Sequence, residues 1–456
     1  MDSPSDSSNA GGERTGGSQG NFIAVLRIRD FRLLWLGQLI SQTGDYFAYT
    51  AMMLVVSRFS TLRGDGEGDL ALAISSLMIV AAVPRLLFGA LAGVFADRWP
   101  RRRAMLFSDV LRMGMTLLLI PAFLLKSLTA VYLLAFLMST VSTLFTSAKG
   151  AVLPLLVPQE QLMPANTISQ VSMMAANFIG PALAGAVFKM LPSEKLWMVF
   201  ILDSFSFFAS GVALWLMSTA GDVRTDRAKL ATAGGPLRRV VDDLLVGLKA
   251  LTQNRTISAL AIVCTISFFA AGGLQVLWFV LLKTRYGFVQ ESELAFRNSI
   301  VDMAFFTGMV LASVAVGNVL SSAAPKWLIF WGLVVSGVAT AIAGHMPSYW
   351  GLVVSVVCLG LFVAPIQAGI STLTQLVVPN DQLGRVGGSI STVTEAAMMS
   401  SLALAGVVPK TLGLANTFLV AGALCWLGAL LAWIRLPAVK AQRNAPTVTP
   451  GEAQPA

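Results

Sequence analysis

The segment LLVPQEQL at residues 155–162 recurs as LVVPNDQL at residues 376–383, a shift of 221 positions. The same shift holds without a gap as far as ALAG at 182–185 and again at 403–406. Chance similarity between Ala- and Leu-rich helices is the alternative explanation. The matched element is polar rather than apolar, which argues against chance. The chain is therefore predicted to contain a duplicated unit.

The composition places this unit in a membrane. Of the 456 residues, 55% are hydrophobic and only 12% are charged, whereas soluble domains carry roughly 25% charged residues. The mean hydropathy is +0.74. Apolar runs of about 20 residues, long enough to cross the hydrocarbon core as a helix, recur along the chain. Such a chain buries its apolar surface in lipid.

The apolar runs predict an all-α membrane protein with twelve transmembrane helices. The expected spans are 31–59, 70–96, 104–125, 128–150, 165–190, 196–218, 255–283, 297–320, 327–345, 349–372, 384–409 and 414–435. The repeat relates spans four and five to spans ten and eleven. Because each half has an even number of spans, both halves enter the membrane in the same orientation, as in parallel-repeat transporters. The fold is thus predicted to consist of two six-helix parallel-repeat halves.

The distribution of basic residues orients the chain. With an even number of spans both termini share one side, and far more of the 32 Lys and Arg residues lie on that side than on the other. The positive-inside rule then places both termini in the cytoplasm of a multi-pass protein of the cytoplasmic (inner) membrane. The net charge of +9 is accounted for by this bias, so no nucleic-acid partner is expected.

The expected domains follow from these spans. Residues 1–25 and 437–456 are rich in small and polar residues or proline, and are predicted to be disordered cytoplasmic tails. The N-terminal six-helix half covers 26–218 and the C-terminal half covers 255–436. The linker 219–254 is basic and contains apolar residues at helical spacing, so an amphipathic helix on the cytoplasmic surface is expected there.

The loop between spans two and three reads GVFADRWPRRR at residues 93–103. It resembles the signature loop of the major facilitator superfamily, in which Gly, Asp-Arg, a second Gly and several basic residues occur at fixed spacing. Pro100 stands here in place of the second Gly. The resemblance implies that this loop latches the two halves together on the cytoplasmic side when the site faces outward. The expected latch residues are Gly93, Asp97, Arg98, Arg101 and Arg102.

The chemistry of the loop suits a latch. Gly93 allows close approach of a second helix, and Asp97 would be favoured at a facing helix N-terminus, which span eleven supplies at 384–388. The alternative is a purely topogenic arginine cluster, which accounts for Arg101 to Arg103 but not for Gly93 or Asp97.

Span five carries NFIGPALAG at residues 177–185, which is similar to the Gly-Pro motif of proton-coupled exporters in this superfamily. Pro181 removes a backbone donor and bends the helix, while Gly180 and Gly185 admit a close neighbour. The core from residue 31 to 435 resembles the branch that contains the enterobactin exporter and the macrolide efflux proteins. FRLLWLGQ at 31–38, Gly44-Asp45, Pro84-Arg85, the segment 156–158 and Ala165-Asn166 carry this resemblance.

Three charges within spans are the candidate machinery for proton coupling and the substrate cavity: Asp45, Arg85 and Glu395. Intramembrane charges are costly, and they are candidate functional residues for that reason. Counting residues from the cytoplasmic ends of their spans places Asp45 and Arg85 at similar depth, so a pair is expected. The pair is either a clamp between spans one and two or a proton-loading site.

The remaining intramembrane charges are given structural or solvated roles. Asp203 and Asp302 lie near the periplasmic ends of their spans, where exposure to solvent is expected. Asp109 and Arg112 lie three residues apart on one helix face and can pair locally. His345 stands without nearby acidic or Cys partners, so no metal site is expected.

Together these features predict a secondary active transporter. The chain has no Gly-x4-Gly-Lys-Ser/Thr loop for nucleotide and no nucleophile with a base, so neither an ATPase nor another enzyme is expected, and no cofactor. The prediction is proton-coupled efflux of an amphipathic drug, macrolide or siderophore by alternating access. The expected partners are the lipid bilayer, the small-molecule substrate and protons, and the chain is expected to be a monomer. The alternatives are an importer or lipid mover on the same fold, or a transport-inactive scaffold or sensor.

Overall fold

The computed structural model describes residues 22–218, 254–318, 324–378 and 383–438, and the regular elements in these ranges are helices. The predicted linker helix and all but the edges of the two predicted tails lie outside these residues. The twelve predicted spans are all helical in the described ranges, with boundaries that differ by a few residues.

Two groups of helices follow each other along the chain. The N-terminal half consists of α1 (Phe22–Arg27), α2 (Arg29–Arg63), α3 (Glu67–Arg98), α4 (Arg101–Leu124), α5 (Leu128–Leu156), α6 (Leu162–Met190) and α7 (Met198–Trp215). The C-terminal half consists of α9 (Arg255–Gly272), α10 (Leu274–Thr284), α11 (Glu291–Asn318), α12 (Pro325–Ala343), α13 (Tyr349–Val377), α14 (Leu383–Leu412) and α15 (Leu414–Arg435). Short 3-10 turns precede α6 and α7.

Eleven spans among the described residues are long and apolar enough to cross a membrane, α9 and α10 counting as one. The twelfth is α2, whose 35 residues include the polar run Gln42-Thr43-Gly44-Asp45. Polar residues that line a cavity lower the mean hydropathy of a helix. For this reason α2 does not meet a criterion that is based on apolar composition alone.

Local sequence signals set several helix ends. Ser127, Asn254 and Ser348 cap α5, α9 and α13 by accepting hydrogen bonds from backbone amides of the first turn, as expected of such residues at N-caps. Gly64, with a φ of 73°, ends α2, and Gly413, with a φ of 80°, separates α14 from α15. Glycine takes this left-handed conformation without a Cβ clash.

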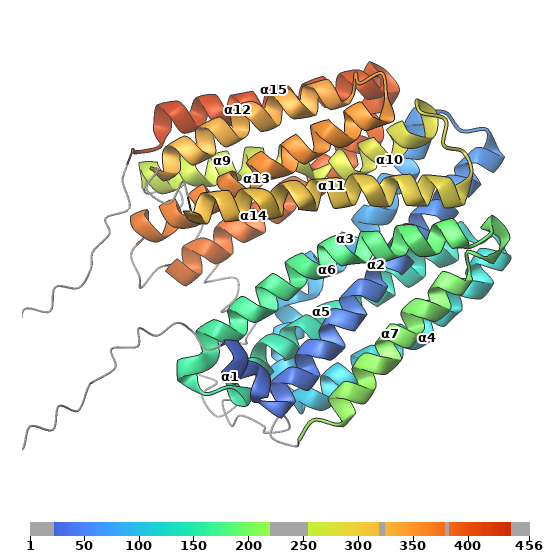
Figure 1. Ribbon diagram of the computed structural model, residues 1–456, viewed down its shortest axis with the longest axis vertical. Helices are drawn as coiled ribbons and strands as arrows, with labels where there is room; N and C mark the ends of the chain where they lie inside the picture. The colour runs from blue at the N-terminus through green and yellow to red at the C-terminus, as the bar shows by residue number, and fades with distance from the viewer. Residues whose placement is uncertain (1–21, 219–253, 319–323, 379–382, 439–456) are drawn as a thin grey trace, which may run out of the picture.

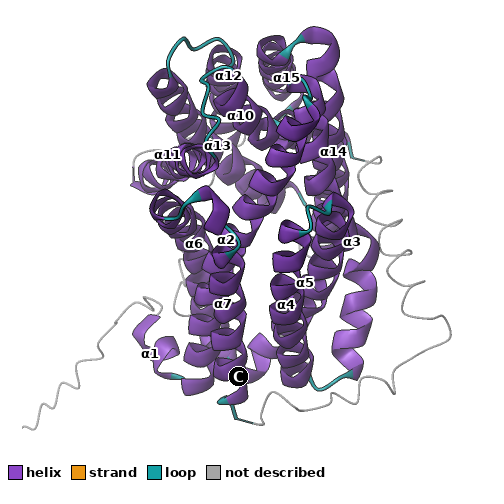
Figure 2. Ribbon diagram, turned by 90° about the vertical axis from the view of Figure 1, so that its right-hand side faces the viewer, coloured by secondary structure: helices purple, strands orange, loops and turns teal. Residues whose placement is uncertain are grey.

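The two halves meet at one end of the molecule and diverge towards the other (Figure 1). We call the end that holds α1 and the last turn of α15 the terminal end, and the end that holds the α2–α3 and α10–α11 connections the far end. Figure 2, in which the far end faces the viewer, shows helices of the C-terminal half above those of the N-terminal half. The halves contact each other through α3 with α14 and through α6 with α11.

The apolar core reflects the same arrangement. The largest cluster of buried apolar residues joins both halves near the far end, for example through Leu54 and Leu77 of one half and Phe279 and Leu402 of the other. Towards the terminal end, the buried apolar clusters stay within a single half. Among the described residues, the buried apolar core that joins the two halves therefore lies near the far end.

Polar contacts reinforce this seal. Arg58 pairs with Glu291 at 3.5 Å and Lys410 pairs with Asp69 at 2.5 Å. The Lys283 ammonium donates to the Ser57 carbonyl at 2.7 Å. Each of these contacts joins one half to the other at the far end.

Candidate functional site

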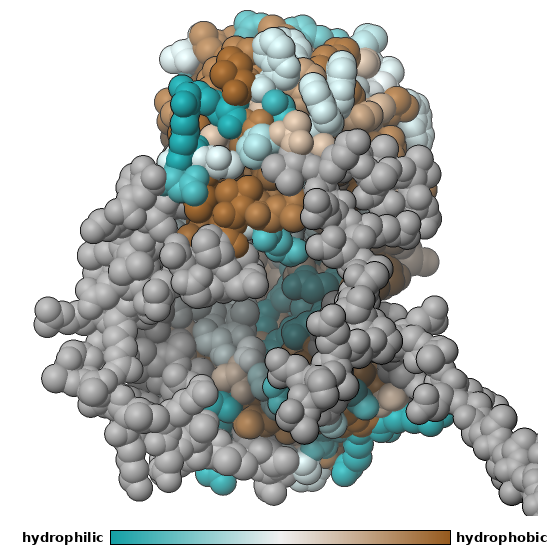
Figure 3. Space-filling model, turned by 90° about the vertical axis from the view of Figure 1, so that its left-hand side faces the viewer, coloured by the Kyte–Doolittle hydropathy of each residue, from teal (hydrophilic) through white to brown (hydrophobic). Residues whose placement is uncertain are grey.

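A cavity of about 550 Å³ lies between the two halves. On the face at the terminal end the surface is hollowed between the halves, with hydrophilic residues visible at depth (Figure 3). Helices α2, α3, α4, α5 and α6 of one half and α9, α10 and α14 of the other supply its walls. The volume lies within the range of small-molecule sites.

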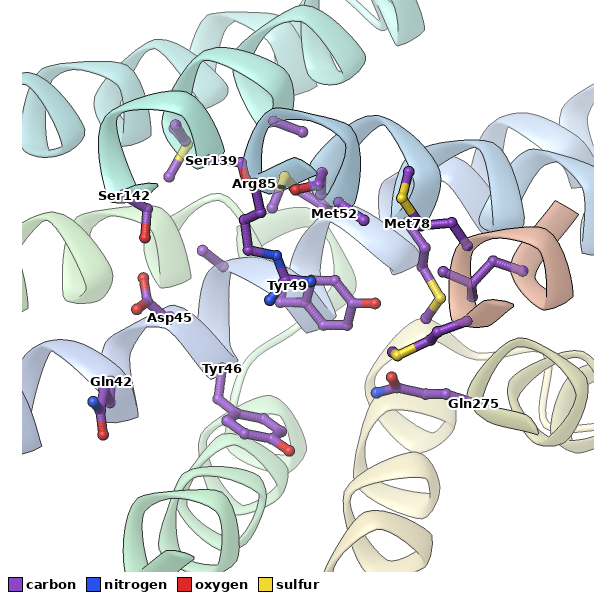
Figure 4. Close-up of a pocket in the computed structure, with 18 of the residues that line it drawn as sticks. Gln42, Asp45, Tyr46, Tyr49, Met52, Met78, Arg85, Ser139, Ser142 and Gln275 are labelled. Atoms are coloured by element: carbon purple, nitrogen blue, oxygen red, sulfur yellow. Dashed lines mark hydrogen bonds between the residues drawn. The ribbon is translucent and has the colours of Figure 1, made fainter. Parts of the chain in front are cut away.

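One face of α2 provides most of the polar wall. Gln42, Asp45, Tyr46, Tyr49 and Met52 line the cavity at the spacing of successive helical turns. Figure 4 shows them with side chains from α3, α5 and α10 around the same space.

Methionines make up much of the apolar wall. The contributors are Met52, Met78, Met138, Met173, Met398 and Met399. The thioether side chain is unbranched and adapts to irregular partners. Such a lining suits a bulky apolar molecule rather than one fixed polar shape.

Asp45 forms an ion pair with Arg112 of α4, not with Arg85 as the sequence predicted. A guanidinium nitrogen of Arg112 lies 2.5 Å from the Asp45 carboxylate. The Arg112 side chain is 7% exposed and that of Asp45 is 43% exposed, so the acid faces the cavity and the arginine lies behind it. The guanidinium also stacks on the Phe207 ring, 4.0 Å from its centroid.

Arg85 pairs instead with Glu395, its counterpart across the cavity, at 3.5 Å. Arg85 is on α3 and Glu395 is on α14, so this ion pair crosses from one half to the other. Both side chains are accessible, at 59% and 34%. All three predicted charges therefore line one cavity, but in two separate pairs.

The expected Asp45–Arg85 pair was wrong because residue counting gives depth along a helix and not direction around it. Packing of α2 is mainly against α7 and α6, and contact with α3 is slight. Arg85 consequently points across the cavity towards α14, and the long side chain of Arg112 reaches Asp45 from α4. The expected local pairing of Asp109 with Arg112 is also wrong, because the guanidinium binds Asp45.

Asp203 and Asp302 were expected to be solvated, and this too is wrong. Their exposed fractions are 0% and 5%. Asp203 accepts a hydrogen bond from Thr116 of α4 at 3.3 Å, and Asp302 accepts one from Asn298 of the preceding turn at 3.0 Å. A position near the end of a span does not imply exposure when the side chain points into the bundle.

The predicted latch is described only in part. The side chains of Gly93, Asp97 and Arg98 lie outside the described residues. Arg101 donates to the Ala151 carbonyl at 3.0 Å, and Arg102 donates to the Leu214 carbonyl at 2.8 Å. These two bonds lie within the N-terminal half, and the latch stays a prediction.

The Gly-Pro motif of α6 lies where two neighbours approach closely. A Cβ added at Gly180 would lie 2.9 Å from the Tyr46 ring, and one added at Gly185 would lie 2.8 Å from the Ser299 Cβ. The first contact is with α2 and the second crosses to α11 of the other half. The helix continues through Pro181.

Sequence reasoning missed the importance of Arg112 and Lys149. The Lys149 ammonium, inside α5, donates to the Gln38 side chain at 2.5 Å, at the edge of a small space that adjoins the main cavity through Gln42. The available signal was a basic residue inside an apolar run. Arg112 was predicted to pair locally with Asp109, and Lys149 was not considered.

The two ion pairs should differ in their effect on stability. Arg112→Gln removes one member of a largely buried pair and should lower the free energy of unfolding by about 2–3 kcal/mol, somewhat less than the ~3–5 kcal/mol of a fully buried pair because Asp45 keeps contact with water. Arg85→Gln, at an accessible pair, should cost about 0–1 kcal/mol. Thermal unfolding of both purified variants checks this, and equal losses would contradict the burial argument.

Comparison with known proteins agrees with this architecture. The family model described as transmembrane secretion effector matches residues 21–453. Macrolide efflux protein A of Streptococcus pyogenes is 24% identical over 399 residues, covering 86% of this chain and 93% of that protein. The enterobactin exporter of Shigella boydii is 23% identical over 368 residues, covering 79% and 83% of the two chains.

A solved structure shares the fold. A bacterial homologue of the iron transporter ferroportin, in an inward-facing state, superposes with a TM-score of 0.65 at 17% identity, over 90% of this chain and 98% of that one. Since the family model spans almost the whole chain, the protein belongs to the transmembrane secretion effector family of the major facilitator superfamily, a family of membrane transporters.

Proposed function

We propose that this protein is a secondary active exporter that moves an amphipathic small molecule out of the cytoplasm in exchange for protons. The observation that carries the proposal is the cavity of about 550 Å³ between two halves that are sealed at the far end, with two carboxylates and two arginines on a methionine-rich wall. A rigid binding module or scaffold has no need of charges exposed inside such a cavity.

The terminal end faces the cytoplasm in this proposal, because the excess of Lys and Arg lies on that side. The conformation described is then inward-facing, as the ferroportin homologue is titled. Substrate enters the cavity from the cytoplasm or from the inner leaflet of the bilayer.

Export requires the far end to open. The Arg58–Glu291 and Lys410–Asp69 pairs and the Lys283 contacts would then separate. Closure of the terminal end would bring the loop at 93–103 onto α14, which is the latch that the sequence predicts. The two halves, 26–218 and 255–436, move as units in this cycle.

Protons are the proposed driving ion because Asp45 and Glu395 reach the cavity beside arginines. A carboxylate next to a guanidinium is held as an anion, and protonation releases the arginine to move. Each acid can therefore convert proton binding into a change of side-chain contacts. Asp45 acts within the N-terminal half, and Glu395 acts between the halves.

The substrate is proposed to be amphipathic. The methionines and the Tyr46 and Tyr49 rings offer a large apolar surface, and the charged groups are few. Two relatives are a macrolide efflux protein and an enterobactin exporter, so a macrolide and enterobactin are the first compounds to test.

Transport into proteoliposomes tests the proposal. With the protein reconstituted and an imposed pH gradient, addition of a macrolide or enterobactin should release protons from the acidic side, and the compound should accumulate there against its own gradient. Accumulation on the opposite side would indicate an importer. Absence of any proton flux with a compound that binds would contradict antiport.

A further inference from the structure

A second carboxyl group lies behind the Asp45–Arg112 pair. Asp203 of α7 has no exposed surface. Its carboxyl accepts hydrogen bonds from Thr116 of α4 and Ser206 of its own helix, both at 3.3 Å. Asp45, by contrast, is 43% exposed to the cavity. One wet and one dry acid thus lie on the two sides of Arg112.

Two contacts between α4 and α7 fix this arrangement. Arg112 stacks on Phe207, and Thr116 bonds to Asp203. Thr116 follows Arg112 by four residues, and Phe207 follows Asp203 by four residues, so the two contacts are one helical turn apart. Asp203 therefore lies about one turn, roughly 6 Å, nearer the far end than Arg112 does.

Helix α2 closes the pocket around Asp203. A Cβ added at Gly44 would lie 2.6 Å from an Asp203 carboxyl oxygen and 2.6 Å from the Ser206 Cβ. Glycine at this position lets α2 approach the acid, and it leaves no room for a ligand. The next residue of α2 is Asp45, so Asp203 packs against the turn of α2 that carries Asp45.

The charges of this cluster do not balance. Helix α2 contributes Asp45, α4 contributes Asp109 and Arg112, and α7 contributes Asp203. Among the described residues of these three helices, one guanidinium lies near three carboxyl groups, of which Asp109 and Asp203 are 1% and 0% exposed. A buried carboxylate without a counter-charge is strongly destabilising, so the cluster is neutral only when two of its acids carry protons.

We propose that Asp203 is a proton-binding site, and that Arg112 moves between Asp45 and Asp203 during transport. This inference rests on the proposed proton coupling. When Arg112 binds Asp45, Asp203 is protonated, as its dry pocket favours. When Asp45 takes up a proton, Arg112 turns to Asp203, which is then an anion.

The proton count is the same in both arrangements. The first has an Asp45 carboxylate and a protonated Asp203, and the second has a protonated Asp45 and an Asp203 carboxylate. One proton is gained by Asp45 and one is lost by Asp203, while Arg112 stays charged. The proton that Asp203 loses is the one that Asp45 gains. Asp45 then releases it at the terminal end, Arg112 returns to Asp45, and Asp203 is reloaded from the side of the far end, so each cycle moves one proton towards the terminal end, as antiport requires.

Infrared spectroscopy of the full-length protein in lipid vesicles tests the exchange without a substrate. At neutral pH we expect a carboxylic-acid C=O band that is lost in Asp203→Asn. In Asp45→Asn, Arg112 loses its partner and should bind Asp203, so the same band should disappear although Asp203 is present. In Asp45→Asn/Arg112→Gln the band should return.

Asp302→Asn is the matched control, because it removes an equally buried carboxyl from the other half. Asp302→Asn alone should not remove the band assigned to Asp203. When Asp45→Asn is added to Asp302→Asn, the band should disappear as it does without the control substitution. A spectrum unchanged by Asp203→Asn would show that Asp203 holds no proton and would overturn the proposal. A band that survives Asp45→Asn would overturn the exchange through Arg112.

These readouts separate the two proposals. If the bands behave as expected and vesicles show no proton-coupled transport, the Asp203 site stands and the proposed function falls. If transport is proton-coupled and the C=O band is unchanged by Asp45→Asn, the proposed function is supported and the proposed role of Asp203 is contradicted.

Discussion

Asp45→Asn should abolish efflux driven by a pH gradient while leaving substrate exchange intact. The amide keeps the size and polarity of the carboxyl group, but it cannot bind and release a proton. Substrate binding on the methionine wall and the movement of the halves do not require ionisation. We expect no accumulation above background in proteoliposomes, with counterflow of labelled substrate close to that of the wild type.

Asp45→Glu is the matched variant, since it keeps an ionisable group on the same turn of α2 and should retain part of the coupled efflux. Asp45→Asn/Arg112→Gln buries no unpaired charge, so it should recover stability lost by Arg112→Gln alone without recovering coupling. Full gradient-driven efflux in that double variant would remove Asp45 from the mechanism and leave Glu395 as the acid to test.

The architecture could be predicted because it depends on one-dimensional signals. The length of the apolar runs predicted the membrane spans, and the repeat of LLVPQEQL at 155–162 predicted the two halves. The one span that fails a hydropathy criterion, α2, was still recognised from its continuous stretch, and its polar face is the one that lines the cavity.

The partners of the charged residues could not be predicted in the same way. Asp45, Arg85 and Glu395 line one cavity, but residue counting predicted an Asp45–Arg85 pair that does not form. Pairing depends on which face of a helix meets which neighbour, and a single sequence does not contain that information. Asp203 was misjudged for the same reason, since burial is set by three helices that are distant along the chain.

The repeat also explains the seal at the far end. Gly185 of α6 and Gly406 of α14 are equivalent under the 221-residue shift. Gly185 packs on Ser299 of α11, and Gly406 packs on Ser75 of α3. Ser75 and Ser299 are each the ninth residue of their helices. Two symmetry-related glycine–serine contacts thus join the halves, and both serines are buried.

Enlarging either glycine should force the far end open. A Cβ at Gly185 would lie 2.8 Å from Ser299, and one at Gly406 would lie 2.9 Å from the Leu72 backbone, so Gly185→Leu or Gly406→Leu cannot keep the present contact. Overpacking costs about 1–3 kcal/mol, which is a roughly five- to 150-fold shift of the conformational equilibrium. Spin labels at residues 63 and 289, with the three native cysteines replaced, should report a longer distance in both variants. The proteoliposome assay should show slower efflux. Gly114→Leu enters open space and should change neither quantity. Because the contacts are related by the repeat, the two variants should act alike, and an unchanged distance in both would show that the glycines do not hold the halves together.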